Sequence, residues 1–246
     1  MSGQQNEIVT AAFIVIGDEV LSGRTKDKNI GFLADYMTNV GIDLAEVRIV
    51  PDIEDRIVEA VNELRAKYTY VFTSGGIGPT HDDITADSIA KAFGVSIDID
   101  PRARQILEDY YPNGEVTEAR LRMARIPSGA GLIANPVSGA PGFVMENVHV
   151  MAGVPKIMQA MVDEIVPTLK TGQKMLSRHV DADLPESRIA AALGDLQSAH
   201  PDVMIGSYPK NDDGRFTTQI VVRSRDPQQI DTVIAAVEQI VSNTKI

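Results

Sequence analysis

Residues 73–85 read TSGGIGPTHDDIT, and this stretch decides the fold. It follows Tyr70-Val71-Phe72, a β-branched and aromatic run that suits a buried strand. Apolar residues then recur at helical spacing from Ile84 to Phe93, and Gly94 stands where a helix would end. The sequence therefore predicts a glycine-rich turn that joins the carboxyl end of a strand to the start of a helix.

The glycines and acids of this turn are suited to a ligand. Gly75, Gly76 and Gly78 let the backbone approach a bound molecule and turn N–H groups toward it, which suits a phosphate. Asp82 and Asp83 could hold a metal ion that neutralises that phosphate. The alternative is a tight turn with an N-capping aspartate. Three glycines within four residues, followed by two acids, favour the ligand site.

Composition narrows the class of protein. A chain of 246 residues fits one large domain, or a main domain with a smaller one, and can bury a substantial core. The formal charge of −11 repels nucleic acid and anionic membranes, so a phosphate ligand needs a local site, with help from a metal. The absence of cysteine excludes disulfides, thiolate nucleophiles and thiolate-bound metals.

The amino end carries no targeting signal that we can identify. Residues 1–7 are polar and lack a basic segment, and the apolar run 8–16 has the length of a strand. We interpret that run as the first core strand and not as a signal peptide. No segment approaches membrane-spanning length. We expect a soluble cytoplasmic protein that binds neither nucleic acid nor membrane.

Strand-like and helix-like segments alternate up to Gly94. This alternation predicts an α/β fold of three layers, a mostly parallel sheet with helices on both faces. The expected strands are 11–16, 44–50 and 68–73, and the expected helices are 29–40, 55–67 and 84–93. Ligands bind at the carboxyl ends of such strands, where the loops 17–29, 51–55 and 74–83 leave the sheet.

The middle of the chain is less regular. Helices are expected over 101–109, 118–124 and 156–169, and a single strand over 144–152. Between them, residues 126–142 are rich in glycine and proline, and a long loop of this kind inside a regular domain is often functional.

A second unit is expected from residue 173. Its predicted order is a strand at 178–184, a helix at 185–199, a hairpin of 203–208 with 216–222 around residues 211–214, and a helix at 227–243. This β-α-β-β-α order resembles a small KH-like α/β domain. The unit holds eight basic and ten acidic residues and no G-x-x-G clamp, which argues against RNA binding. We therefore predict domains at 1–172 and 173–246.

The first loop after a strand adds further candidate ligands. Asp18 and Glu19 could bind a hard cation, and Ser22, Thr25 and Asn29 could orient a phosphate or a sugar. An exposed capping loop, in which Asp27 caps the next helix, explains the same residues equally well. Asp52 could supply a third acid, but it could also cap the helix that starts near residue 54.

The loop at 135–142 could lie against a flat ligand because its residues are small. Its candidates are Asn135, Ser138, Gly139 and Pro141, of which Asn135 could read the amide-like edge of a heterocycle. A structural loop held by its prolines is the alternative. His81 is a conceivable general base in the glycine-rich turn. No nucleophilic triad and no zinc-protease spacing is present.

Four motifs, at 17–23, 73–85, 126–143 and 153–155, together resemble the MoaB/Mog-like superfamily. The resemblance is strongest to its CinA-like branch, in which a KH-like connector follows. It implies either molybdopterin binding, as in MoaB and Mog, or metal-dependent hydrolysis of nucleotide pyrophosphates such as ADP-ribose or FAD, as associated with CinA-type and FAD synthase domains. The nicotinamide-mononucleotide deamidase domain of full-length CinA proteins lies outside the resemblance, so that activity is not carried over.

The resemblance also implies roles for residues. Asp83, which precedes Ile84-Thr85, matches the acid of the Mog pterin-phosphate site, and Asp52 matches a second acid. The leading hypothesis is a pyrophosphohydrolase that uses Mg, Mn or Co, with Asp83 and Asp52 as catalytic residues; a molybdopterin-binding module is the alternative. A homo-oligomer, with a dimer favoured, is expected. The expected metal ligands are Asp18, Glu19 and Asp83, and the expected phosphate contacts are Ser74, Gly75, Gly76, Ile77, Gly78 and Thr80.

Overall fold

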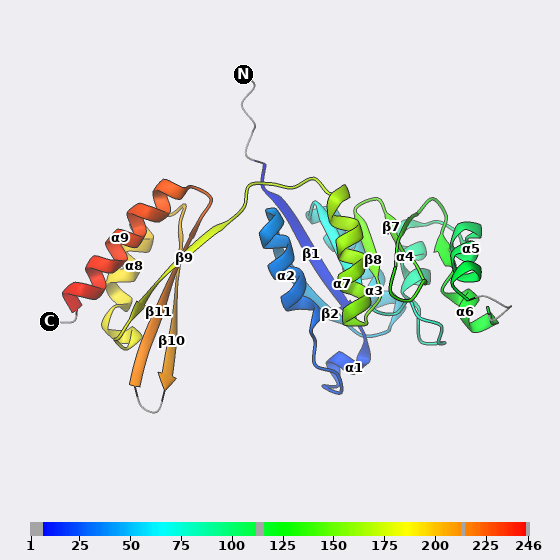
Figure 1. The fold of residues 1–246 in the computed structure, drawn as a ribbon, viewed down its shortest axis with the longest axis horizontal. Helices are drawn as coiled ribbons and strands as arrows, with labels where there is room; N and C mark the ends of the chain where they lie inside the picture. The colour runs from blue at the N-terminus through cyan, green and yellow to red at the C-terminus, as the bar shows by residue number, and fades with distance from the viewer. Residues whose placement is uncertain (1–6, 112–115, 213–214, 245–246) are drawn as a thin grey trace, which may run out of the picture. The chain divides into compact units, whose positions relative to one another are not determined.

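The chain forms two compact units, Met1–Gly172 and Gln173–Ile246. The computed structural model describes residues 7–111, 116–212 and 215–244. Each unit has a sheet of its own, which Figure 1 shows as strands flanked by helices.

A six-stranded sheet forms the centre of the first unit. Its strand order is β2-β1-β3-β8-β7-β6, and β2, β1, β3 and β8 run parallel while β7 and β6 alternate in direction. The strands are β1 Val9–Ile16, β2 Ile42–Val50, β3 Tyr70–Ser74, β6 Gly131–Ile133, β7 Gly142–Met145 and β8 Val148–Met151. The prediction of a mostly parallel α/β sheet is confirmed.

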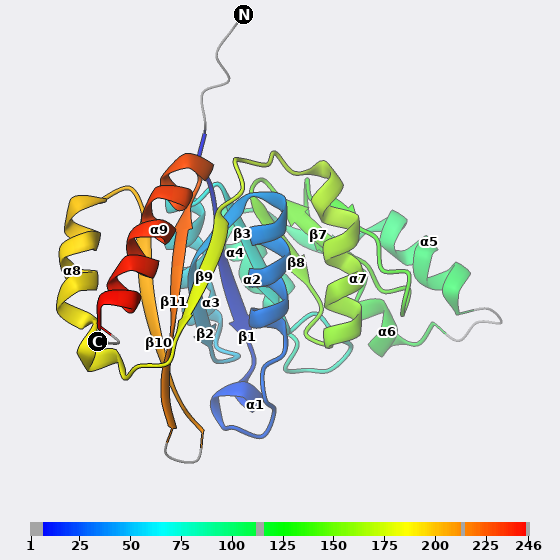
Figure 2. The ribbon, with the colours of Figure 1, turned by 60° about the vertical axis from the view of Figure 1, so that its left-hand side comes forward.

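Strand β1 is buried on both faces, and its side chains alternate between two cores. Ala12, Ile14 and Ile16 pack on one side with helices α3 and α4, whereas Phe13 and Val15 pack on the other side with α2 and α7. Figure 2 shows α2 and α7 side by side on one face of the sheet. This arrangement explains why β1 is a continuous apolar run and not an alternating one. The sheet and the helices on its two faces are the three layers that the sequence predicts.

Helices α2 to α5 end within one residue of their predicted limits, whereas α6 and α7 end two and four residues earlier than predicted and the short α1 lies in a segment predicted as a loop. Helices α2 and α4 both stop at a glycine in the left-handed region, Gly41 with φ 83° and Gly94 with φ 66°. The helices are α1 Asp18–Leu21, α2 Asn29–Val40, α3 Glu54–Lys67, α4 Thr85–Phe93, α5 Pro101–Tyr110, α6 Glu118–Arg122 and α7 Pro155–Ile165, and a 3₁₀ turn follows at Val166–Thr168.

The single strand predicted over 144–152 is wrong, because this segment is part of a hairpin. The chain reverses between β7 and β8 at Glu146, whose φ of 51° is in the left-handed region. Asn147 holds the turn by donating hydrogen bonds to the carbonyl oxygens of Arg65 and Tyr68. Apolar residues flank the reversal on both sides, so the hydrophobic pattern does not reveal it. The long loop at 126–142 likewise contains β6 and a short strand β5, Arg125–Pro127, which pairs with β4, Ile97–Ile99.

The second unit has the expected β-α-β-β-α order. Its antiparallel sheet has the order β10-β11-β9, and its core includes apolar side chains of β11, α8 and α9. The predicted helix over 185–199 begins later than expected, because Glu186–Arg188 forms a 3₁₀ turn before α8. The centre of the hairpin, residues 213–214, lies outside the described residues. The elements are β9 Leu176–Ala182, α8 Ala190–Ala199, β10 Met204–Asp212, β11 Arg215–Ser224 and α9 Pro227–Thr244.

Among the helices that the structure describes, none is both long and apolar enough to cross a membrane.

One buried histidine makes the first unit sensitive to acid. His149 lies on β8 with its ring 5.3 Å from that of Phe72 and 5.8 Å from that of Tyr70, and only 6% of the residue is exposed. Burial lowers the pKa of His149 to about 4. The unfolded chain binds the proton at its ordinary pKa of 6.5, so the contribution of this residue to stability is lost as the pH falls from 6.5 toward 4.

We predict that His149→Phe removes this part of the acid sensitivity. Between pH 7 and pH 4 the free energy of unfolding of the variant should improve relative to that of the parent by about 3 kcal/mol. Urea unfolding at several pH values measures this difference. The exposed His81→Gln is the control and should follow the parent. Parallel curves for His149→Phe and the parent would contradict the assignment.

Candidate functional site

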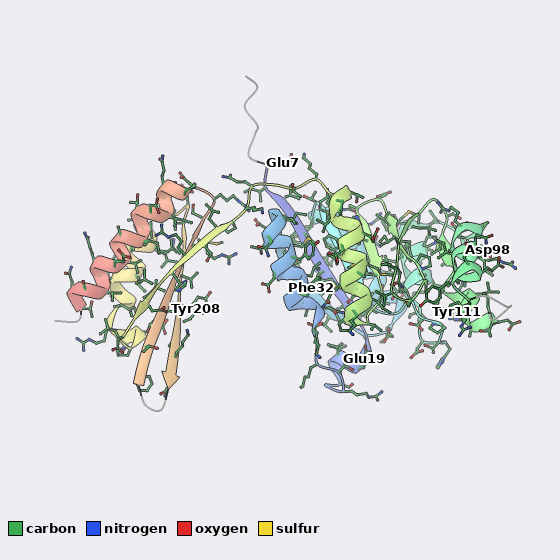
Figure 3. The ribbon with its side chains drawn as sticks, viewed as in Figure 1. Glu7, Glu19, Phe32, Asp98, Tyr111 and Tyr208 are labelled. Atoms are coloured by element: carbon green, nitrogen blue, oxygen red, sulfur yellow. The ribbon has the colours of Figure 1, made fainter. Side chains whose placement is uncertain are left out.

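The loops that leave the parallel strands meet at one edge of the sheet. The N–H of Gly17, after β1, donates to the carbonyl oxygen of Val50 at the end of β2, over 3.1 Å. The N–H of Gly75, after β3, donates to the carbonyl oxygen of Met151 at the end of β8, also over 3.1 Å. Figure 3 shows Glu19 on α1, beyond the carboxyl end of β1. This is the edge at which a ligand was expected.

The glycine-rich loop needs its first two glycines for steric reasons. A Cβ atom on Gly75 would clash with the carbonyl oxygen of Ile16, and one on Gly76 would clash with the hydroxyl of Thr85. Both glycines are in the left-handed region, with φ of 108° and 66°. Thr85, the first residue of α4, holds the loop because its hydroxyl donates to the carbonyl oxygen of Gly75 and its N–H donates to that of Gly76, each over 2.9 Å.

Some backbone N–H groups of this loop donate hydrogen bonds within the protein, and others do not. The N–H group of Gly75 donates to Met151, and that of Thr80 donates to the carboxylate of Asp83. Within the described part of the chain, the N–H groups of the three residues at 76–78 donate to no protein acceptor. Consecutive free N–H groups at left-handed turns form a cradle for an anion.

These residues line a cavity of about 480 Å³. Its walls are the glycine-rich loop, part of the 135–142 loop and the loop between β8 and α7, and it also includes Glu19, Thr25 and Met123. Among the described residues that line it are two acids, Glu19 and Asp83, and no lysine or arginine. Arg122 and Arg125 line not this cavity but an adjoining one that shares the residues 76–78, and Arg125 pairs there with Asp87. An anion bound in the large cavity would therefore lie beside two carboxylates, which favours an accompanying cation.

Asp83 is held in a defined orientation at this cavity. Its Oδ2 accepts hydrogen bonds from the N–H of Thr80 over 2.8 Å and from the hydroxyl of Thr80 over 2.6 Å. Thr80 itself is exposed and is not a lining residue. Thr80 therefore orients Asp83. Because Thr80 does not line the cavity, the structure does not place it for the direct phosphate contact that the sequence predicts.

The structure does not bring Asp52 and Asp18 to the cavity. Asp52 Oδ2 accepts a hydrogen bond from the N–H of Asp18 over 3.0 Å and so fixes the loop after β1. Burial is the main cause that raises the pKa of Asp52, and the charges of Asp18, Glu19 and Asp82 raise it further, while the N–H of Asp18 opposes them. Asp52 therefore holds the loop after β1, close to other acidic side chains, and does not line the cavity.

The predicted metal ligands Asp18, Glu19 and Asp83 are not assembled as a set. In the ranges that the structure describes, no three His, Asp or Glu side chains are grouped so that they could hold a metal ion. Glu19 and Asp83, however, line the same cavity. A Mg²⁺ ion is usually held by one or two carboxylates, by water and by the phosphates of its substrate. The residues present fit a cation that arrives with a phosphate ligand, and they do not fit one held by protein alone.

Asn135 lines the cavity, but its side-chain amide is fully used within its own loop. Its Nδ2 donates to Ser138 Oγ over 2.6 Å and to the carbonyl oxygen of Ala140 over 2.8 Å. Its Oδ1 accepts from the N–H groups of Val137 and Ser138, each over 3.1 Å. Asn135 therefore shapes the loop and presents Ser138 to the cavity, and it has no free group with which to read a heterocycle.

The other sequence candidates do not line the large cavity. Gly139 packs against the ring of Tyr110, where a Cβ atom would clash, and Pro141 lines an adjoining cavity of about 20 Å³ that shares the residues 76–78 with the large one. Ser74 is buried at the end of β3, with 1% of the residue exposed. His81 is exposed and is absent from the lining. Sequence reasoning missed Met123 as a wall residue, and no motif marks it.

Comparisons with known proteins give a family match for each of the two units. The family described as a probable molybdopterin binding domain matches residues 12–171, which is more than half of the chain. The chain therefore belongs to the MoaB/Mog-like family of molybdopterin-binding domains. Residues 174–246 match the middle domain of FAD synthase.

Some similar proteins match nearly the whole chain. A protein of Pyrobaculum calidifontis is 34% identical in an alignment of 251 positions that covers 96% of each chain. A probable FAD synthase of Caenorhabditis elegans is 29% identical in an alignment of 259 positions that covers 95% of this chain and 50% of that protein. The crystal structure of CinA from Thermoplasma acidophilum, described as a protein of unknown function, is 34% identical with a TM-score of 0.62; the match covers 65% of this chain and 98% of that one. The predicted resemblance to the MoaB/Mog-like superfamily and to CinA is confirmed.

We predict that Gly75→Ala strongly destabilises the first unit. A Cβ atom there meets the backbone of β1, which cannot move without disturbing the core, so the free energy of unfolding should fall by about 3 kcal/mol or more. The control is Gly23→Ala, which has a φ of 72° but open space around it, and should cost about 1 kcal/mol. Equal losses of stability in chemical denaturation would contradict this account.

We predict that Asp52→Asn stabilises the protein at neutral pH. The asparagine keeps an oxygen for the N–H of Asp18 and removes a partly buried charge that Asp18, Glu19 and Asp82 repel. Because the pKa of Asp52 is raised, the parent carboxyl becomes neutral as the pH falls, and the advantage of the variant should then disappear. Thermal unfolding at pH 7.5 and at pH 3.5 measures both effects. A lower melting temperature for Asp52→Asn at pH 7.5 would contradict the prediction.

Proposed function

We propose that this protein is a divalent-metal-dependent nucleotide pyrophosphohydrolase that acts on a dinucleotide of the ADP-ribose or FAD class. The observation that carries the proposal is the row of three N–H groups without protein acceptors at 76–78, which lines one cavity with the carboxylates of Glu19 and Asp83. A cavity of about 480 Å³ has the size of a small-molecule site.

Each group of residues that lines the cavity has a role in the proposed reaction. The N–H groups at 76–78 bind one phosphate of the pyrophosphate and stabilise the charge that develops on it. Glu19 and Asp83 hold the cation, and Thr80 keeps Asp83 in its orientation. The bound metal ion would polarise a phosphoryl oxygen and lower the pKa of a water molecule. Ser138 and the loop before α7 contact the base or sugar.

The relatives support a nucleotide ligand in two ways. The second unit matches the middle domain of FAD synthase, and a relative is named a probable FAD synthase. The acidic wall is the physical support for a metal, because a pyrophosphate beside two carboxylates needs a counter-charge.

A second candidate function follows from the family description. A probable molybdopterin binding domain could use the same N–H groups for the single phosphate of a pterin, with no hydrolysis. The two candidates differ in their products. The pyrophosphohydrolase releases two monophosphates in a metal-dependent reaction, whereas the binding module retains its ligand unchanged.

We predict hydrolysis of ADP-ribose to AMP and ribose 5-phosphate, or of FAD to AMP and FMN, when Mg²⁺, Mn²⁺ or Co²⁺ is present. Asp83→Ala should lower kcat/KM about 100-fold or more, because one of two cation ligands is lost. Chromatographic analysis of the products measures this. The exposed Asp35→Ala on α2 is the control and should retain full activity. Full metal-dependent turnover by Asp83→Ala would contradict the role of Asp83, and no turnover by the parent would favour the pterin-binding function.

A further inference from the structure

A second, smaller cavity lies against the proposed active site, beside the start of α2. Its volume is about 50 Å³, and it shares the wall residues Glu19, Thr25, Gly153 and Pro155 with the large cavity. The share of volume taken by one water molecule in the liquid is about 30 Å³. The small cavity therefore has room for one or two hydroxyl groups of a ligand that occupies the large cavity.

Asn29, one of the residues that line this small cavity, has a buried side-chain oxygen, Oδ1, without a hydrogen-bond partner among the described residues. Asn29 is the first residue of α2, and 5% of the residue is exposed. Its Nδ2 donates to the carbonyl oxygen of Gly153 over 2.9 Å and lies 3.5 Å from Ser74 Oγ. These two contacts set the orientation of the amide, so Oδ1 is the acceptor that remains.

A buried acceptor without a donor is unfavourable, and it marks a place for a donor that comes from outside the protein. Lys26 and Lys28 also line the small cavity, and the amino end of α2 adds a partial positive charge. Asp27 and Glu19 line this cavity as well, so the two basic and two acidic side chains balance and the wall favours neither an anionic nor a cationic group. A neutral hydroxyl suits the site because it donates to Asn29 Oδ1 and still accepts a hydrogen bond at its own oxygen.

The hydroxyl subsite adjoins the phosphate cradle through one segment. Gly153, which holds the amide of Asn29, lies against the glycine-rich loop, since a Cβ atom on Gly153 would be 3.2 Å from Gly75 Cα. A ligand with its phosphate at the N–H groups at 76–78 would therefore place a neighbouring sugar close to Asn29. A ligand hydroxyl that reaches Asn29 must therefore be only a few bonds from the phosphate.

We propose that Asn29 Oδ1 accepts a hydrogen bond from a hydroxyl of the ribose or ribityl chain next to the pyrophosphate, and so selects for polyhydroxylated ligands. This proposal rests on the proposed function, and it assigns Asn29 a specificity role at the same site. The sequence alone indicates Asn29 only as one of several polar groups able to orient a phosphate or a sugar.

A cycle of protein and ligand changes tests the contact directly. Hydrolysis of ADP-ribose is compared with that of analogues that each lack one ribose hydroxyl, for the parent and for Asn29→Ala. We expect Asn29→Ala to lower kcat/KM for ADP-ribose about 10-fold, and to have little further effect on the one analogue that lacks the contacted hydroxyl. The same loss for every analogue would overturn the proposal, because damage to the loop affects all ligands alike.

Asn147→Ala is the matched control for this cycle. Asn147 also donates two hydrogen bonds to backbone carbonyl oxygens, but it lies at the β7–β8 turn and lines neither cavity. Its substitution should change kcat/KM for all analogues by one common factor. A hydroxyl-dependent effect of Asn147→Ala would show that the cycle reports structural damage, and would overturn the assignment to Asn29.

If the protein hydrolyses no dinucleotide, a second measurement tests the hydroxyl subsite at Asn29 directly. The side-chain amide signal of Asn29 is identified by NMR as the one that Asn29→Ala lacks, and the parent is titrated with D-ribose, with ribitol and with tetrahydrofuran. A saturable shift with the two polyols, and none with tetrahydrofuran, would support the hydroxyl subsite while the proposed hydrolysis fails. No shift with either polyol in a protein that lacks hydrolysis would overturn both.

Discussion

The close approach of Gly75 to the carbonyl oxygen of Ile16 is the constraint on which the site depends. It brings the glycine-rich loop against the end of β1, the strand that is buried on both faces. The loop can then cross the carboxyl edge of the sheet without a side chain in the way, and Thr85 fastens it to α4. Residues 76–78 lie between these two attachments and line the cavity. Packing of the core thus leaves their N–H groups without acceptors among the described residues.

The electrostatics of the site follow from the same edge of the sheet. Acids on three different loops converge there, and Asp52 is the one that burial affects most clearly. Two other acids, Glu19 and Asp83, face the cavity in which the free N–H groups lie. A site with N–H donors and carboxylates suits a phosphate and a cation that bind together better than it suits either alone. This complementarity is the physical basis of the metal-dependent function that we propose.

Most of the fold could be predicted from the sequence, because local signals mark its elements. Glycines at 41 and 94 end two helices by adopting conformations that other residues avoid, and those limits were correct. The reversal at Glu146 could not be predicted, since apolar residues continue through it and Asn147 holds the turn through contacts with residues about 80 positions away in the chain. In the site, the structure places the glycine-rich loop, Asp83 and Asn135 at one cavity. It also shows what no sequence pattern reveals, that the side chains of Asn135 and Asp52 hold loops through hydrogen bonds.

The sequence by itself determined the alternation of strands and helices, the edge of the sheet at which the glycine-rich loop and its neighbouring loops lie, and the residue types that gather there. These follow from hydrophobic period, glycine positions and chain order, all of which are local properties. Only the tertiary structure decided which polar groups are left without partners. The N–H groups at 76–78 and the Oδ1 of Asn29 are distinguished from similar atoms only by the absence of an acceptor or donor, and hydrogen-bond pairing across loops distant in the chain sets that absence.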